Sequence, residues 1–128
     1  MTFNSTYLTE HRDNAKDKID TDFQYFCVGD DDTAATATDT TLGNELFRDT
    51  RDAVDKTTFP AEISVTGELS SAEYNGNDVV EFGWSKSPNT DEDIEQHIVL
   101  TGASFTKTSD IAVVVETNIE VEVTEEEV

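Results

Sequence analysis

The stretch IAVVVETNIEVEV, residues 111–123, carries the clearest pattern in this sequence. Its odd-numbered positions hold only Ile, Val or Thr, and from Glu116 onward its even-numbered positions hold Glu or Asn. Because successive side chains of a β-strand point to opposite faces, this period of two predicts a strand with one buried face and one solvated face. We expect one long strand here, or one strand interrupted by a bulge.

Two further stretches alternate in the same way, at residues 46–58 and 59–73. The second is the more regular of the two, and it predicts another strand that is half buried against the core. Its odd positions hold the apolar residues Phe59, Ala61, Ile63, Val65 and Leu69, and its even positions hold Glu62, Ser64, Thr66 and Glu68.

Shorter apolar runs complete the predicted β structure, at residues 23–28 before Gly29 and at residues 79–84. The sequence NGND at residues 75–78 is a strong turn signal, because Asn and Gly tolerate a positive φ. We therefore predict that this turn joins the strand at 59–73 to the strand at 79–84 as a hairpin. Another strand is expected near residues 96–105, with polar loops at 30–38 and 87–93.

The N-terminal residues 6–19 are polar and compatible with a weakly amphipathic helix, whose thin apolar stripe needs a partner surface. The predicted fold is mainly β, with one N-terminal helix followed by an antiparallel β-sandwich-like domain of about six strands. We expect residues 1–22 to form the helix and its linker, residues 23–123 the β domain, and residues 124–128 an acidic tail.

Charge limits the functions that this chain can have. Its 128 residues contain 8 Lys and Arg against 29 Asp and Glu, a formal net charge of −21. Such a chain repels phosphate backbones and anionic lipids, so nucleic-acid partners and membrane insertion are not expected. Many carboxylates and few lysines suit a protein that works in concentrated salt, where screening weakens self-repulsion. Neither a signal peptide nor a membrane-spanning run is recognisable, so synthesis in the cytoplasm is expected.

Signals for catalysis are weak throughout. His11 and His97 have no nearby Cys or second His in the sequence, and we expect both to be solvated surface residues. The acidic run at residues 30–32 lacks the spacing of a calcium loop, and Cys27 among apolar neighbours is expected to be a small buried side chain. We expect no catalytic residues, no metal, no cofactor and no enzymatic activity.

Arg48 and Glu81 raise a structural question instead, because each is an ionisable residue among apolar neighbours. A buried charge needs a partner, so one hypothesis is a partly buried ion pair between Arg48 and Glu81 across two strands. The alternative, almost equally favoured, is that both are ordinary surface charges. Asp39 is expected to cap a short turn over residues 40–43.

An ordered set of residues resembles the N-terminal region of tail-fibre and tail-collar-type proteins of tailed viruses. That region has a helix, an apolar strand ending in Gly, a loop of small residues, then Asp-Thr-x-Leu-x-Asn-Glu-x-x-Arg and later Glu-hydrophobic-Gly-hydrophobic. The matching positions here are Gly29, the loop at 33–38, Asp39, Thr40, Leu42, Asn44, Glu45, Arg48, Glu81, Phe82, Gly83 and Trp84.

The resemblance implies an attachment-type module of the virion tail, as a tail-tip, baseplate or tail-fibre subunit that acts in assembly and host adhesion. It implies other tail or baseplate subunits as partners, a separate receptor-binding protein, and a homo-oligomer that is a trimer or a higher ring. Together with the acidity it points to a tailed virus of haloarchaea. The alternatives are a capsid decoration or turret protein, and a non-viral binding domain of a halophile. The interaction candidates are Asp39, Leu42, Asn44, Glu45, Arg48, Glu81 and Trp84.

Overall fold

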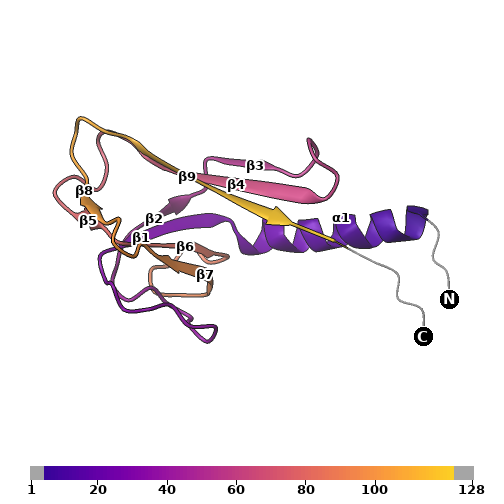
Figure 1. Ribbon diagram of the computed structural model, residues 1–128, viewed down its shortest axis with the longest axis horizontal. Coiled ribbons are helices and arrows are strands. Elements are labelled where there is room, and N and C mark those ends of the chain that lie inside the picture. The colour runs from indigo at the N-terminus through magenta and orange to yellow at the C-terminus, as the bar shows by residue number, and fades with distance from the viewer. Residues whose placement is uncertain (1–4, 123–128) are drawn as a thin grey trace.

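The computed structural model describes residues 5–122 of the chain, with side chains from residue 8 onward. Within this range one helix is followed by nine strands, and every strand pair is antiparallel (Figure 1). The elements are α1 (Ser5–Asp22), β1 (Tyr25–Gly29), β2 (Glu45–Thr50), β3 (Ala53–Asp55), β4 (Glu62–Leu69), β5 (Asp78–Val79), β6 (Glu81–Ser85), β7 (Ile94–Val99), β8 (Phe105–Thr106) and β9 (Val113–Glu120). The predicted fold class is therefore confirmed.

The number of strands differs from the predicted six because three predicted strands are each split, one of them at residues 79–84 into part of β5 and most of β6. Residues 46–58 contain β2 and β3, which belong to different sheets, and residues 96–105 contain most of β7 and the start of β8. Alternation alone does not reveal these breaks, since a chain that crosses from one sheet to the other can keep its period of two. The predicted acidic tail at 124–128 lies outside the described residues.

Two sheets form the sandwich. The four-stranded sheet has the order β2-β1-β6-β7, the three-stranded sheet has the order β3-β4-β9, and β5 pairs with β8 separately. Gly67 of β4 lies directly over the ring of Phe26 of β1, so close that a Cβ at Gly67 would overlap the ring. Trp84 Nε1 of β6 donates to Thr117 Oγ1 of β9 at 3.0 Å. Hence β4 lies over β1, and β9 lies over β6.

The core between these sheets is aromatic on one side and aliphatic on the other. Phe26 packs against Trp84 and Phe82, with ring centroids 5.3 and 5.8 Å apart. Ile63, Val65 and Leu69 of β4 face them and are fully buried. These residues come from the alternating positions that the sequence predicted to be buried, whereas Phe59 is 59% exposed because it precedes β4 in a loop.

β9 also follows its predicted alternation, with half-buried odd positions and exposed even positions. Its outer face lies beside that of β4, and the register places Glu62 directly opposite Glu120. Asn118, with its amide oriented to satisfy its neighbours, donates to Glu116 at 2.8 Å and to Glu62 at 3.2 Å. The outer face of the three-stranded sheet is therefore acidic.

The turn at residues 75–78 is present, but the predicted hairpin is wrong. Tyr74 and Gly76 have φ values of 63° and 84°, as a tight turn requires. β4, however, pairs with β3 and β9, while β6 pairs with β1 and β7. All five residues of β6 are buried, so β6 takes an interior position in the other sheet, where both of its faces are covered.

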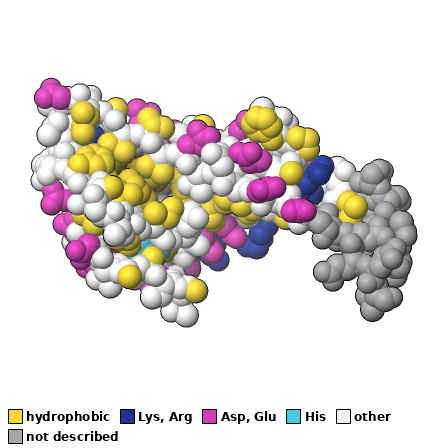
Figure 2. Space-filling model, in the orientation of Figure 1, with side chains coloured by type: hydrophobic (Ala, Val, Ile, Leu, Met, Phe, Trp, Pro, Cys, Tyr) yellow, Lys and Arg dark blue, Asp and Glu magenta, His cyan; other side chains and the backbone are white. Residues whose placement is uncertain are grey.

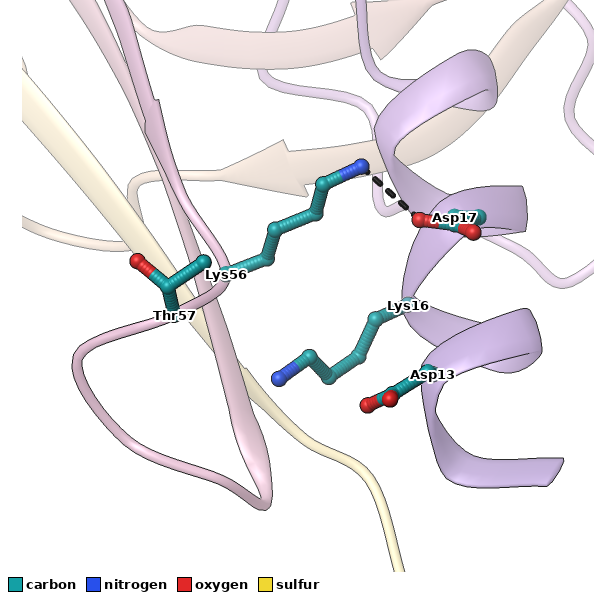
Figure 3. A pocket seen from close by; sticks show the side chains of 5 residues that line it. All are labelled: Asp13, Lys16, Asp17, Lys56 and Thr57. Carbon is teal, nitrogen blue, oxygen red and sulfur yellow. Dashed lines mark hydrogen bonds and ion pairs between the residues drawn. The ribbon is translucent and has the colours of Figure 1, made fainter. Parts of the chain in front are cut away.

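Helix α1 projects beyond the four-stranded sheet and lies beside the three-stranded one (Figure 1). Its apolar residues Ala15 and Ile19 pack on the core, as the predicted stripe requires. Figure 3 shows Lys16 and Lys56 in a hollow of about 220 Å³ between the helix and the connection from β3 to β4. Lys56 Nζ lies 2.8 Å from Asp17 and 2.7 Å from Asp20, so cations hold the polar helix in place.

Candidate functional site

The predicted interaction residues fall into three separate places. Asp39, Leu42 and Asn44 lie on the loop of residues 30–44, which covers the outer face of the four-stranded sheet at Glu81. Glu45 and Arg48 form a second cluster on β2, and Trp84 lies in the core. We call Glu81, His97 and Asp39 the loop-anchoring cluster.

Glu81 is fully buried, and both of its carboxylate oxygens are occupied. Oε2 accepts hydrogen bonds from the backbone amides of Asp31 (3.0 Å) and Asn44 (2.9 Å). Oε1 accepts from the amide of Gly43 at 2.7 Å and lies 2.8 Å from His97 Nε2. Glu81 thus ties both ends of the loop to β6.

His97, on β7, was expected to be a solvated surface residue, and that prediction is wrong. Its side chain is 6% exposed, with Nδ1 2.8 Å from Asp39 Oδ2 and Nε2 2.8 Å from Glu81 Oε1. Each ring nitrogen therefore lies at hydrogen-bond distance from a carboxylate oxygen. Because both nitrogens are engaged in this way, the ring links Asp39 to Glu81 and neither nitrogen is free to act as a base or to bind a metal.

Asp39 caps in the opposite direction from the prediction. Its carboxylate accepts from the backbone amide of Thr36 at 2.9 Å, three residues before it, and from the Thr36 hydroxyl at 2.7 Å. The hydrogen bond from the Thr36 backbone amide is the main reason that the pKa of Asp39 falls to about 2, and the hydrogen bond with His97 lowers it further. Asp39 is therefore ionised at all ordinary pH values.

Close packing of the loop on the sheet depends on small residues. A Cβ at Gly29 would overlap the Glu81 carboxylate and the carbonyl oxygen of Asn44. Asn44 also donates from its side chain to Asp30 at 2.7 Å, and Leu42 packs against Cys27.

Burial is the main cause that raises the pKa of the Cys27 thiol to about 12. The predicted burial of Cys27 is thus confirmed.

A hollow of about 220 Å³ opens beside this cluster, lined mainly by loop residues with His97 at its base. The lining includes Thr33, Asp39, Thr41 and Gly43. Within residues 8–122, no group of three or more His, Cys, Asp or Glu side chains is arranged to hold a metal ion. The charged groups at the hollow are engaged with one another, so the cluster fixes the loop on the sheet.

The predicted ion pair between Arg48 and Glu81 is wrong, although both side chains are buried. Arg48 binds Glu45 instead, through Nε at 2.9 Å and Nη2 at 2.7 Å. Its Nη1 donates to Ser85 Oγ, to the carbonyl of Ser87 at 2.8 Å and to that of Glu92 at 3.0 Å. The pair thereby holds the loop between β6 and β7. Sequence alone did not reveal it, because residues three apart on a bulged strand are not obvious partners.

Most cationic side chains of this protein hold its own structure together. The chain has eight Lys and Arg residues, and seven of them make ion pairs or hydrogen bonds within the chain. The seven are Lys16, Lys18, Arg48, Arg51, Lys56, Lys86 and Lys107. Lys107 is fully buried, and its Nζ donates to Asn75 Oδ1 and to the carbonyl of Thr108.

Comparison with known proteins adds no relative to this description: no protein-family model, no curated protein and no solved structure matches the chain. Within residues 5–122, the helix is too polar to cross a membrane.

Proposed function

We propose that this chain is a structural subunit without enzymatic activity, which works in concentrated salt at the tail tip, baseplate or tail-fibre attachment point of a tailed virus of haloarchaea. It assembles with other tail subunits, as a trimer or a higher ring, and does not bind nucleic acid or insert into membranes. In the virion it contributes to assembly and host adhesion, together with a separate receptor-binding protein.

The distribution of charge is the observation that carries this proposal. Seven of the eight cationic side chains make contacts within the chain, while the outer face of β4 and β9 carries carboxylates that have no Lys or Arg among them. Glu62 and Glu120 are directly opposed, an arrangement that destabilises a sheet in dilute solution. At multimolar salt the screening length falls to about 3 Å, and this repulsion is largely removed.

The position in the tail rests on the resemblance, and the loop-anchoring cluster supports it. Five residues of the resembling pattern, Gly29, Asp39, Leu42, Asn44 and Glu81, meet where the loop of residues 30–44 is fixed to the sheet. Because these residues are far apart in sequence and act together, the pattern describes one structural unit. A rigid loop on a rigid sheet suits a subunit whose work is mechanical.

Salt dependence tests the first half of the proposal. The chain is melted and sized by light scattering in dilute buffer and in about 3 M KCl, a range over which screening changes severalfold. We expect both the melting temperature and the oligomer mass to rise with KCl. Equal stability and equal mass at both salt concentrations would contradict the salt-adapted assembly.

Localisation tests the second half. Antibodies against this chain, carrying gold particles, are applied to intact tailed virions and examined by electron microscopy. We expect the label at the tail tip. Label on the capsid shell would instead identify a decoration or turret protein, and a chain found only outside virions would identify a cellular binding domain.

A further inference from the structure

The sandwich is one strand short on one side. The four-stranded sheet places β1 under β4 and β6 under β9, as the contacts of Phe26 with Gly67 and of Trp84 with Thr117 show. β7 is the next strand beyond β6, but within the described residues the three-stranded sheet ends at β9. The position over β7 and beside β9 therefore holds no strand.

The inner face of β7 is only partly covered as a result. In the register of β6 with β7, Gln96 pairs with Trp84 and Ile98 pairs with Phe82, whose side chains point into the core. Whereas Trp84 and Phe82 are buried, Gln96 and Ile98 are only partly buried, and Gln96 Oε1 is buried without a hydrogen-bond partner. Figure 2 shows hydrophobic side chains gathered over β5, β8 and the start of β9, where Phe105 and Ile111 are 37% and 39% exposed.

The edge of β9 is the second half of this open position. β9 is eight residues long and pairs with β4 alone in the described part of the chain. Its other edge therefore presents unpaired backbone N–H and C=O groups, which are a template for one more strand. Its inner side chains continue the apolar surface, while Glu116 and Glu120 point outward.

We propose that an extended segment of another virion protein adds to the free edge of β9, lies over β7 and completes the three-stranded sheet. The segment is apolar at alternate positions, which face Ile98 and the core. Its other positions carry Lys, Arg or Thr, because they lie beside Glu116 and Glu120 on the outer face. This inference names the partner surface of the proposed tail subunit and in that respect rests on the proposed function.

A second copy of this chain does not fit the position. Pairing two β9 strands about a two-fold axis would bring the β6 strand of the second copy into the space of β7, because β6 lies under β9 in each copy. The acidic C-terminal sequence, residues 124–128, would place more carboxylates beside Glu116 and Glu120. Because neither the β9 edge nor the C-terminal sequence of a second copy fits, we assign the position to a strand of opposite charge from a different protein.

Synthetic peptides as long as β9 test the proposal on the whole, unmodified chain. The probe alternates Val with Lys and Thr, the charge control replaces Lys with Glu, and the apolar control replaces every Val with Thr. Binding is measured at the lowest KCl concentration at which the chain melts as a folded protein. Amide exchange is followed residue by residue by NMR, with β3, the other edge of the same sheet, as the internal control.

The Val and Lys peptide is expected to bind and to slow exchange at alternate amides along β9, but not along β3, since added strands donate and accept at every second residue. We expect the Glu peptide to bind about tenfold more weakly, from two like-charge contacts, and the Thr peptide not to bind at about 1 mM. Absence of binding by the Val and Lys peptide at about 1 mM overturns the proposal. Binding without protection of β9, or equal binding by the Thr peptide, overturns it too.

The experiments can refute the tail assignment and the docking surface at β9 independently of each other. Capsid label together with strand addition at β9 removes the tail assignment and leaves the docking surface. Tail label without strand addition removes only the docking surface.

Discussion

Replacing Glu81 with Gln changes one atom and exposes what the loop-anchoring cluster contributes to stability. The carboxylate accepts four hydrogen bonds, two at each oxygen, in a fully buried position. A Gln side chain has one oxygen, so its NH₂ group must face two of the four donors. If it faces His97, the tautomer of the ring that accepts at Nε2 and donates from Nδ1 to Asp39 can pair with it, which leaves only the Gly43 amide without a partner.

One or two buried donors are therefore left unsatisfied, each at a cost of about 1–3 kcal/mol. We expect Glu81→Gln to lower the free energy of unfolding by about 3 kcal/mol, a large share of the 5–15 kcal/mol that is usual for a domain. The melting temperature should fall by roughly 10 °C. Glu68→Gln, at an exposed position of β4, is the matched control and should change stability by less than about 0.5 kcal/mol.

Urea unfolding in concentrated KCl measures this difference, with the fluorescence of Trp84 as the probe. Trp84 is the only Trp and is 1% exposed, so its emission reports the opening of the core. Amide exchange at residues 31, 43 and 44 should also accelerate in the variant, because these amides bind Glu81. A loss below about 1 kcal/mol, or unchanged exchange at these amides, would refute the role assigned to Glu81.

Three further outcomes follow from the described contacts. Arg48→Lys should lower the free energy of unfolding by about 2 kcal/mol, because Lys cannot bind Glu45 with two parallel hydrogen bonds; denaturant unfolding with unchanged stability would contradict this. The contacts that lower the pKa of Asp39 from its ordinary value of 3.8 stabilise the folded chain above about pH 3.8, and this stabilisation is lost as the pH falls toward about 2. Across this pH range the melting temperature of the natural chain should therefore fall more than that of Asp39→Asn. Glu120→Lys should stabilise the chain by about 0.5 kcal/mol in dilute buffer, by pairing with Glu62, and by almost nothing in about 3 M KCl; an equal gain at both salt concentrations would exclude screening as the cause.

Periodicity was enough to predict the parts of the fold in which burial repeats along the chain. The alternation at residues 111–123 and 59–73 identified β9 and β4 and the faces that they bury, because the pattern of a half-buried strand is written in consecutive residues. The helix was also predicted, although it ends at Asp22 rather than at residue 19. The choice of partner strands was not predictable in the same way, since pairing depends on residues far apart in sequence.

The site illustrates the same division. A buried partner for Arg48 could be anticipated from its apolar neighbours, but the predicted partner was Glu81, and the bulged register of β1 with β2 places Glu45 beside Arg48 instead. His97 gave no local signal, because its two carboxylate partners lie 58 and 16 residues away. Burial of a polar side chain is a property of the whole fold, and it cannot be deduced from adjacent residues.

What the sequence determined by itself is the kind of protein: a mainly β chain with an acidic surface, because strand periodicity and net charge are sums over local residues. What only the tertiary structure decided is the use of its charges. It buried Glu81 and His97 between the sheet and the loop of residues 30–44, and within residues 5–122 it left β9 without a neighbouring strand over β7. Both results depend on which surfaces meet when the two sheets stack, and that stacking joins residues from opposite ends of the chain.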